Sequence, residues 1–305
     1  MASNLTGLRK SRRFRFGSRE LIISVTVGAI IIHYGMFLFF PILYGLYGSF
    51  FDWNITTSNF KFVGIDNYAR KLQDPVFWKS LFNNVYFTFF SVLLVTVLSL
   101  IIALSIHSVK RFKTFFRTVY FMPVVTSLVA ASFVWKWMYD PTMGLFNQIL
   151  DMFNLPHVEW LTDKHTAMPS IILMTVWKDA GFAIVLYMVG LLNIPSSLFE
   201  SAKIDGANSR AIFWNITLPM LRSTTFFVVV TNIIGYLQVF IPIYLMTKGG
   251  PGTSTFTTSF MIYDAAFDYY NFGEASTISF LLFFVILIVT FAQTALTKRR
   301  GGFDQ

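Results

Sequence analysis

The sequence predicts an all-α polytopic membrane protein with six transmembrane helices. Of its 305 residues, 55% are hydrophobic and only 13% are charged, a composition that soluble globular domains do not have. The apolar residues are gathered in six long runs, and the basic residues are gathered between them, on every second connection. A chain with this alternation is expected to cross a bilayer several times.

Each of the six runs comes near or exceeds the roughly 18 to 20 apolar residues that a helix needs to cross hydrocarbon. The fourth is expected to begin earlier than its uncharged part, near Met168, and to include Lys178 and Asp179. The first run is too long for a cleaved signal peptide and lacks a small-residue cleavage site. The runs are Leu21–Phe51, Ser80–Val109, Thr118–Trp135, Ala180–Phe199, Ser223–Thr247 and Ala275–Thr297.

The basic residues predict the orientation of the chain. Sixteen of the 24 Lys and Arg residues lie in segments that share one side of the membrane, which the positive-inside rule assigns to the cytoplasm. We therefore expect a basic cytoplasmic tail over residues 1–20, a transmembrane domain over 21–305, and a cytoplasmic C-terminus. The net charge of +9 follows from this topology, so nucleic-acid binding is not needed to explain it. The sixteen residues are Arg9, Lys10, Arg12, Arg13, Arg15, Arg19, Lys110, Arg111, Lys113, Arg117, Lys203, Arg210, Arg222, Lys298, Arg299 and Arg300.

A polar segment, residues 195–219, separates the fourth and fifth runs. Ser197 and Glu200 are spaced as in a capping box, which predicts the start of a short helix. Asp205-Gly206 predicts its end, because glycine accepts the left-handed conformation that terminates helices. The alternative is that Asp205-Gly206 is only a turn, as any loop could contain.

A second short helix is expected to follow and to run to Pro219, with Asn208 or Ser209 as its N-cap. The segment would then be a helix–glycine–helix hairpin between two membrane spans. Such a hairpin is a poor lipid-facing structure but a good docking surface for another protein.

The spacing of residues in this segment resembles the EAA loop of ABC importer permeases, whose consensus is Glu-Ala-Ala, three residues, Gly, then a distal Ile-x-Leu-Pro. This chain has Ser201 where the family usually has alanine, and serine is equally small. By resemblance, the residues that couple transport to an ATPase are Glu200, Ala202, Asp205, Gly206, Ala207, Phe213, Ile216 and Pro219.

A glycine-rich segment, Thr247-Lys248-Gly249-Gly250-Pro251, could be mistaken for a phosphate-binding loop. A P-loop needs its lysine directly after the last glycine, whereas Lys248 precedes the glycines and is expected outside the cell. The segment resembles instead the Thr-x-Gly-Gly-Pro motif of carbohydrate-uptake permeases of the maltose, glycerol-phosphate and multiple-sugar type, in the first subunit of the pair.

Three further stretches resemble the same group of permeases. Residues 62–68, Phe-Val-Gly-Ile-Asp-Asn-Tyr, match one of its motifs, and a structured turn over the helix ends is the alternative explanation. Tyr139-Asp140-Pro141-Thr142 and Trp160-Leu161 are shorter and individually weaker matches.

The resemblance implies a type I ABC importer permease with a MetI-like core formed by spans two to six, in a bacterial or archaeal inner membrane. Its partners would be a second, distinct permease subunit, two cytoplasmic ATPase subunits and an extracytoplasmic solute-binding protein that delivers a sugar. No cofactor is implied. The chain has no Walker A motif and could not supply the energy itself.

The residues of the predicted hairpin suggest how it would dock. Ala207, Phe213 and Ile216 recur at near-helical spacing and would form an apolar stripe suited to a groove in the ATPase. Glu200 and Asp205 would orient the hairpin through caps and ion pairs. Burial of Phe213 against the protein's own helices is the alternative.

Polar residues inside the spans are candidates for the substrate path. An unpaired charge at Lys178 or Asp179 would be costly in lipid, so we expect both to face a water-filled path or a partner subunit. Asn232 and Tyr236 are four residues apart and share a helix face, as sugar binding through hydrogen bonds and an aromatic platform requires. Hydrogen bonding between helices is the alternative role for each. The candidate path residues are Thr175, Asp179, Asn232, Tyr236 and Gln238.

Neither catalysis nor metal binding is expected. The four histidines are scattered without a carboxylate at ligand spacing, and the chain has no cysteine and no Gly-x-Ser-x-Gly motif. An ion-driven secondary transporter remains an alternative. It would predict inverted repeats and broken helices with buried acids. The sequence has no clear repeat, and few of its acids are expected to be buried. The same kind of importer for a solute other than a sugar is a second alternative.

Overall fold

The computed structural model describes residues 18–109 and 113–299. The chain divides into two compact units between Gly48 and Ser49, and each is described by itself. Most of the predicted basic tail, with Lys110, Arg111 and Arg300, lies outside the described residues.

The first unit is one helical run made of α1 (Ser18–Tyr34), the π-helical turn η1 (Gly35–Phe39) and α2 (Phe40–Gly48). Its stretch from Arg19 to Gly48 is long and apolar enough to cross a membrane. The π turn ends two residues before Pro41, whose ring would clash with the carbonyl four residues earlier in a regular α-helix. The predicted first span is confirmed, but it ends at Gly48 rather than at Phe51.

The second unit contains three long helices that confirm the predicted second, fourth and sixth spans. They are α4 (Pro75–Ser108), α8 (Ala167–Leu192) and α15 (Phe272–Arg299). Two further candidate spans are bent pairs of helices, Phe115–Val125 with Leu128–Met138 and Ser209–Met220 with Arg222–Tyr236. The described residues therefore contain four unbroken candidate spans, or six if each bent pair is counted as one.

The predicted third span is not continuous. Helix α5 (Lys113–Val125) ends in a tight turn, and α6 (Leu128–Met138) leaves it at 96°. Thr126 N–H bonds to the Pro123 carbonyl, and Ser127 is extended, so the helical ladder stops between the two helices. An uninterrupted span over Thr118–Trp135 was therefore a wrong prediction.

The predicted fifth span, Ser223–Thr247, is also broken. Helix α12 (Arg222–Tyr236) stops at Tyr236, and a separate short helix, α13 (Ile241–Met246), begins with Pro242 in its first turn. Phe240, which precedes α13, has a non-helical backbone (φ −135°, ψ −59°), so the two helices are separate. Pro242 lies in the first turn of α13, where its missing N–H costs no helical hydrogen bond. The carbonyl of Leu237, in the connection, accepts a hydrogen bond from Asn84 Nδ2 of α4 at 2.8 Å.

Helices α4, α8 and α12 enclose the main core of the second unit, to which Phe87, Ile184 and Val228 contribute. Two glycines of α8 permit this close packing. A Cβ on Gly181 would lie 2.1 Å from the Tyr120 carbonyl oxygen of α5, and one on Gly190 would lie 2.7 Å from Thr224 Oγ1 of α12. A larger residue at position 181 would meet the backbone of α5 and so would move that helix, whereas one at position 190 would displace the side chains of Thr224 and Leu221.

A small antiparallel sheet departs from the predicted all-α fold. Strands β1 (Phe51–Asn54) and β2 (Asn59–Phe62) pair and lead into α3 (Asp66–Gln73). Asn67 Nδ2 donates to the carbonyls of Ser49 and Phe51 at 2.9 Å, and Ser49 Oγ lies 2.7 Å from Tyr68 Oη. Residues 62–68 therefore form a structured turn, as the alternative explanation of that motif proposed.

An ion-pair cluster fastens α3 to α15. Lys71 Nζ lies 2.7 Å from Asp74 Oδ2 and 2.5 Å from Glu274 Oε1. Burial lowers the pKa of Lys71, but its hydrogen bonds to the two carboxylates outweigh burial and leave that pKa raised. Burial raises the pKa of Asp74, and its bonds with Lys71 and the Val76 N–H leave it lowered. Both groups therefore stay charged at neutral pH.

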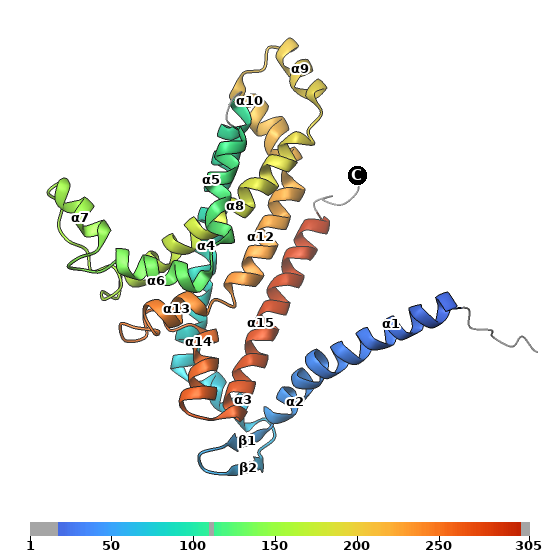
Figure 1. Cartoon of the computed structure of the whole chain (residues 1–305), viewed down its shortest axis with the longest axis vertical. Helices are drawn as coiled ribbons and strands as arrows, with labels where there is room; N and C mark the ends of the chain where they lie inside the picture. The colour runs from blue at the N-terminus through green and yellow to red at the C-terminus, as the bar shows by residue number, and fades with distance from the viewer. Residues whose placement is uncertain (1–17, 110–112, 300–305) are drawn as a thin grey trace, which may run out of the picture. The chain divides into compact units, whose positions relative to one another are not determined.

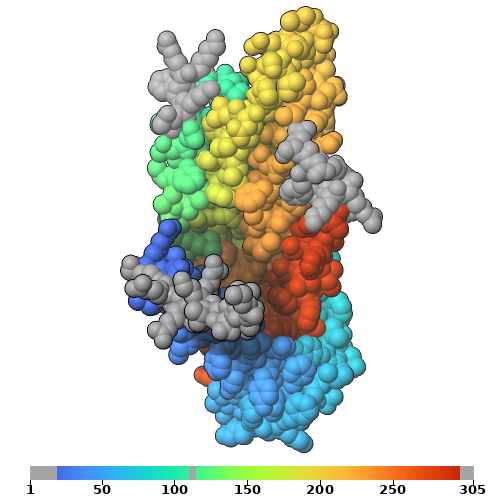
Figure 2. Space-filling view, turned by 90° about the vertical axis from the view of Figure 1, so that its right-hand side faces the viewer, coloured from blue at the N-terminus to red at the C-terminus, as the bar shows by residue number. Residues whose placement is uncertain are grey.

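Within the second unit, β1, β2 and α3 lie at one end, and the hairpin of α9 (Ser196–Ile204) and α10 (Ser209–Ile212) lies at the other (Figure 1). The start of α5 lies at the same end as the hairpin (Figures 1 and 2). The segments predicted to be cytoplasmic and external are thus separated in space. The remaining elements are α7 (Leu145–Met152), η2 (Phe213–Thr217), α11 (Leu218–Met220), α14 (Thr258–Tyr263) and η3 (Asp264–Asp268).

Candidate functional site

The hairpin between the fourth and fifth spans has the predicted helix–glycine–helix form, but its first helix begins differently. Helix α9 starts at Ser196, directly after Pro195, and Leu198 N–H bonds to the Pro195 carbonyl. Ser197 is therefore inside the first turn, and the predicted capping box with Glu200 is wrong. Pro195 is the N-cap residue, and no side chain caps the first turn of α9.

The predicted stop at Gly206 is confirmed. Gly206 has φ +78°, its N–H bonds to the Lys203 carbonyl, and the Ala207 N–H bonds to the Ala202 carbonyl at 2.9 Å. These two bonds form a Schellman motif, which satisfies the last carbonyls of α9 and turns the chain sharply. The left-handed conformation of Gly206 thus determines the turn between the two helices of the hairpin.

The second helix is capped by Asn208, one of the two predicted candidates. Asn208 Oδ1 accepts a hydrogen bond from Ala211 N–H at 2.8 Å. The helix continues through the π turn η2 and α11, which contains Pro219, and α12 follows at a 60° bend next to the fully buried Leu221. As in the first unit, the π turn ends two residues before the proline.

The exposed apolar surface of the hairpin differs from the predicted stripe. Ile216 packs against the main core, and Ala207 and Phe213 are half-buried. The most exposed apolar side chains are instead Ile204 and Trp214, with 86% and 57% of their surface exposed. Neither was selected from the sequence, although a large apolar residue beside Asp205-Gly206 is an unusual feature of a charged hairpin tip.

The two acidic residues of the hairpin have a simpler role than predicted. The carboxylates of Glu200 and Asp205 are exposed, and the described part of the chain gives neither an ion pair. The backbone of Asp205 forms the C-cap of α9. The orientation of the hairpin therefore comes from Gly206 and Asn208 rather than from ion pairs.

Lys178 was expected to face a water-filled path or a partner subunit, and the structure contradicts this expectation. Its Nζ is buried inside the second unit and donates to the Val124 carbonyl at 3.0 Å. Val124 is in the last turn of α5, where the break before α6 leaves carbonyls without a helical partner. A cation at a helix C-terminus is also favoured by the helix dipole. Lys178 thus stabilises the break in the third span.

Asp179, the next residue, points to another helix. Tyr236 Oη donates to Asp179 Oδ2 at 3.1 Å, and the Tyr236 ring packs edge-on against Phe87. Only 6% of the Tyr236 surface is exposed, whereas Asp179 is half-buried. The structure thus joins two of the five candidate path residues, one from α8 and one from the end of α12.

The other three candidates do not join this pair. Thr175 is buried, and its hydroxyl donates to the Ile171 carbonyl in its own helix. Gln238 is exposed beyond the end of α12, and its Nε2 donates to the Ile234 carbonyl. Asn232 is half-buried one turn before Tyr236.

The bent and straight spans and the exposed hairpin define a membrane-embedded transport component. A family model agrees: residues 95–302 match the binding-protein-dependent transport system inner membrane component. The chain belongs to this family of ABC transporter permeases. Its place is therefore the inner membrane, and the family's members have no catalytic site of their own.

Two curated relatives illustrate the similarity. A probable ABC transporter permease of Pyrococcus horikoshii is 34% identical over 88% of this chain and 92% of its own length. The trehalose/maltose transport system permease of Thermococcus litoralis is 34% identical over 95% of this chain and 96% of its own length.

A solved structure confirms the fold over almost the whole chain. The bacterial alginate ABC transporter, in complex with a periplasmic protein that holds an alginate pentasaccharide, contains a chain with a TM-score of 0.82 and 23% identity. The match covers 95% of this chain and 98% of that chain. Family and fold together exclude the ion-driven secondary transporter that the sequence had left open.

Proposed function

We propose that this chain is one permease subunit of an ATP-driven, binding-protein-dependent importer of a sugar or oligosaccharide. A second, distinct permease would complete the path, two cytoplasmic ATPase subunits would hydrolyse ATP, and an extracytoplasmic solute-binding protein would deliver the solute. The chain would not be an enzyme, since coupling rather than catalysis is the task of its exposed hairpin.

The observation that carries the proposal is the exposed hairpin at the basic end of the second unit. Ile204 and Trp214 are apolar side chains that water surrounds unless a partner covers them. Both lie on a hairpin whose bends are fixed by Gly206 and Asn208. A rigid, apolar tip between polar flanks suits a groove in another protein.

The hairpin is also connected to the spans in a way that suits coupling. Ile216 packs against the main core, and Pro219 and the buried Leu221 mark the bend into α12. A displacement of Trp214 would therefore move α12 as a unit rather than be lost in a flexible loop. The proposed coupling residues are Glu200, Ala202, Asp205, Gly206, Ala207, Phe213, Ile216 and Pro219, to which we add Ile204 and Trp214.

The far end of α12 supports a link to the substrate path. It carries Tyr236, bonded to Asp179 of α8, so motion of α12 would change this pair. We propose that Asp179 and Asn232 line the path, with Tyr236 orienting the Asp179 carboxylate. Thr175 and Gln238 remain weaker candidates, because their hydrogen bonds are made within their own segments.

The sugar class is supported by what the similar proteins are named for. The Thermococcus litoralis relative serves trehalose and maltose, and the alginate transporter is seen with a pentasaccharide-bound periplasmic protein. A non-sugar solute remains the alternative for this chain.

Reconstitution tests the proposal. The chain is placed in lipid vesicles alone, and also with its partner permease, ATPases and binding protein, and uptake of labelled trehalose, maltose, lactose and glycerol is measured with ATP. We expect uptake of a saccharide by the full complex only. Accumulation by the chain alone contradicts the need for partners, and uptake of glycerol without any saccharide contradicts the sugar class.

A variant tests the docking surface separately. Trp214→Ala should reduce the amount of ATPase that co-purifies with the chain, because it removes the largest exposed apolar side chain of the hairpin. The matched control is Trp137→Ala, which removes an equally exposed tryptophan at the end of α6. Equal loss of ATPase from both variants would contradict docking at the hairpin.

A further inference from the structure

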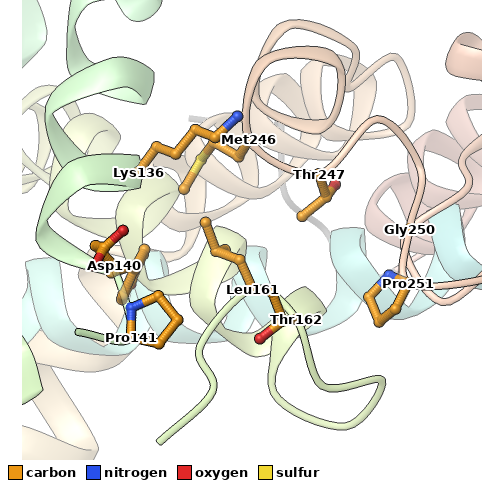
Figure 3. Close-up of a pocket in the computed structure, with 10 residues that line it drawn as sticks. Lys136, Asp140, Pro141, Leu161, Thr162, Met246, Thr247, Gly250 and Pro251 are labelled. Carbon is orange, nitrogen blue, oxygen red and sulfur yellow. The ribbon is translucent and has the colours of Figure 1, made fainter. Parts of the chain in front are cut away.

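Two sequence segments that are weak matches by themselves, Tyr139–Thr142 and Trp160-Leu161, meet the Gly-Gly-Pro segment around one pocket of the second unit. The pocket has a volume of about 440 Å³ and lies between the end of α6, the loop before α8 and the Gly-Gly-Pro loop after α13 (Figure 3). The residues on which the argument depends are Lys136, Asp140, Leu161, Thr162, Thr247 and Pro251.

The pocket lies toward the end of the unit opposite the hairpin. Its Gly-Gly-Pro loop is fastened to the outer part of α4, where Asn83 Nδ2 donates to the carbonyls of Thr253 and Phe256 at 2.8 and 2.9 Å. Helix α4 begins at Pro75, directly after α3 of the outer end. In the predicted topology, the pocket is therefore reached from outside the cell.

The walls of the pocket are pre-formed. Thr255 Oγ1 lies 2.7 Å from Thr247 Oγ1 and donates to the Gly250 carbonyl at 2.7 Å, which closes the loop on itself. Gly249 has φ +82°, and a Cβ there would lie 2.7 Å from the Phe256 ring. Such internal bonding reduces the ordering that a ligand would have to impose.

Four polar groups at the pocket retain hydrogen-bonding capacity. Asp140 Oδ1 is occupied by Thr142 and the Met143 N–H, but Oδ2 has no partner among the described residues. Lys136 Nζ uses one of its three donors on the Leu245 carbonyl. The hydroxyl of Thr162 donates to Glu159 and can still accept, as can that of Thr247.

The chemistry of this lining selects a class of ligand. One carboxylate and one ammonium group cancel in charge, and hydroxyls supply the other polar contacts. Leu161 and Pro251 add apolar surface between them (Figure 3). A neutral polyhydroxylated ring, with hydroxyls at its edge and C–H groups on its faces, matches such a mixture, and the volume is within the range of small-molecule sites.

We propose that this pocket is an outer saccharide subsite, which holds one sugar unit before it enters the membrane path at Asp179 and Tyr236. The proposal rests on the proposed function, because it presumes that the solute is a saccharide. It explains why the Gly-Gly-Pro loop, the Tyr-Asp-Pro-Thr turn and the Trp-Leu segment are brought together in one place.

A cysteine variant tests the subsite directly, because the natural chain has no cysteine. In the reconstituted complex without binding protein, Thr162→Cys is labelled with a thiol reagent in the presence and absence of maltose, trehalose or lactose. A separate sample contains the binding protein and no sugar. We expect at least one of these sugars to slow labelling several-fold. The control is Thr253→Cys, exposed in the Gly-Gly-Pro loop but outside the pocket, whose labelling should not change.

The Lys136→Met substitution in the Thr162→Cys background should raise the sugar concentration that gives half protection by about tenfold, as expected for one lost hydrogen bond to a charged group. Protection by the binding protein alone, with none by sugar, overturns the proposal and makes the pocket a docking point for that protein. Absence of labelling in every condition also overturns it. Uptake by the complete, unlabelled complex distinguishes a failure of the subsite from a failure of the proposed function. If the proposed function is wrong, that complex takes up no saccharide.

Discussion

Lys178 and Asp179 are adjacent in sequence, but they act on different neighbours. Successive residues of a helix point about 100° apart, so Lys178 reaches α5 while Asp179 reaches α12. Gly181, one turn later, brings α5 close enough for the lysine to reach the Val124 carbonyl. One short stretch of α8 thus fixes a broken span on one side and a polar pair on the other.

We predict that Lys178→Met destabilises the protein. The methionine keeps the apolar stem of the lysine but leaves the Val124 carbonyl without its donor, at a cost of about 1–3 kcal/mol. Thermal inactivation of the purified complex in detergent should occur at a lower temperature. The control is Lys164→Met, on an exposed loop, which should change little. Unchanged thermal stability of Lys178→Met would mean that another group satisfies the break.

The Asp179–Tyr236 pair gives a prediction that separates path from packing. Tyr236→Phe keeps the ring against Phe87 and removes only the hydroxyl that bonds Asp179. We expect normal recovery of the complex but saccharide-stimulated ATP hydrolysis reduced several-fold, about the value of one hydrogen bond.

Tyr236→Ala should behave differently, because deleting a buried aromatic ring costs about 3–5 kcal/mol and lowers the amount of folded complex. Asp179→Asn serves as the control, since its amide oxygen can still accept from Tyr236. If Tyr236→Phe transports normally, the hydroxyl is only a link between helices and the path lies elsewhere.

At the scale of elements, the hairpin depends on one residue in a left-handed conformation. A Cβ on Gly206 would have no atom within 4 Å, so substitution there changes the backbone preference and creates no clash. We predict that Gly206→Val, which disfavours φ +78° by at least about 1–2 kcal/mol, lowers ATP-driven uptake while the protein still inserts. Uptake is measured in vesicles that contain the complete complex.

The matched substitution is Gly206→Asn, because asparagine adopts the left-handed conformation more readily than other side chains. It should keep most of the uptake that valine loses. Equal uptake by both variants and the natural chain would show that the conformation of Gly206 is not needed for coupling.

The elements differ in how far the sequence predicts them. Straight spans are recognisable from length and apolarity, and Gly206 and Asn208 from their local backbone preferences. The sequence did not predict the helix breaks at Thr126 and after Tyr236. Each break leaves a carbonyl without a helical partner, and a residue far away in sequence donates to it: Lys178 to Val124 and Asn84 to Leu237. Exposure is also decided by tertiary packing, which places Ile216 partly buried against the main core and leaves Ile204 in solvent.

At the scale of the whole molecule, the second unit has its predicted cytoplasmic and external segments at opposite ends, as the charge pattern of the sequence predicts. The hairpin and the start of α5, both basic in sequence, share one end, and the sheet and α3 lie at the other (Figure 1). The candidate path pair, Asp179 and Tyr236, lies between the coupling hairpin and the outer pocket. Asp179 is in the middle of α8, which begins after a pocket loop and leads to the hairpin, and Tyr236 ends α12, which follows the hairpin. This order is what an importer requires, with entry outside and energy input inside.

The topology itself gives a final prediction, which the natural absence of cysteine makes simple to test. Thr253 is exposed in the Gly-Gly-Pro loop, and Ser197 is exposed on α9. If sixteen basic residues set the orientation by the positive-inside rule, these positions face opposite sides of the membrane. In intact cells, a membrane-impermeant maleimide should label Thr253→Cys, provided that it can pass any outer envelope. It should label Ser197→Cys only after the inner membrane is opened. If Ser197→Cys is labelled in intact cells and Thr253→Cys is not, the orientation is opposite to the predicted one. The hairpin could then not meet a cytoplasmic ATPase.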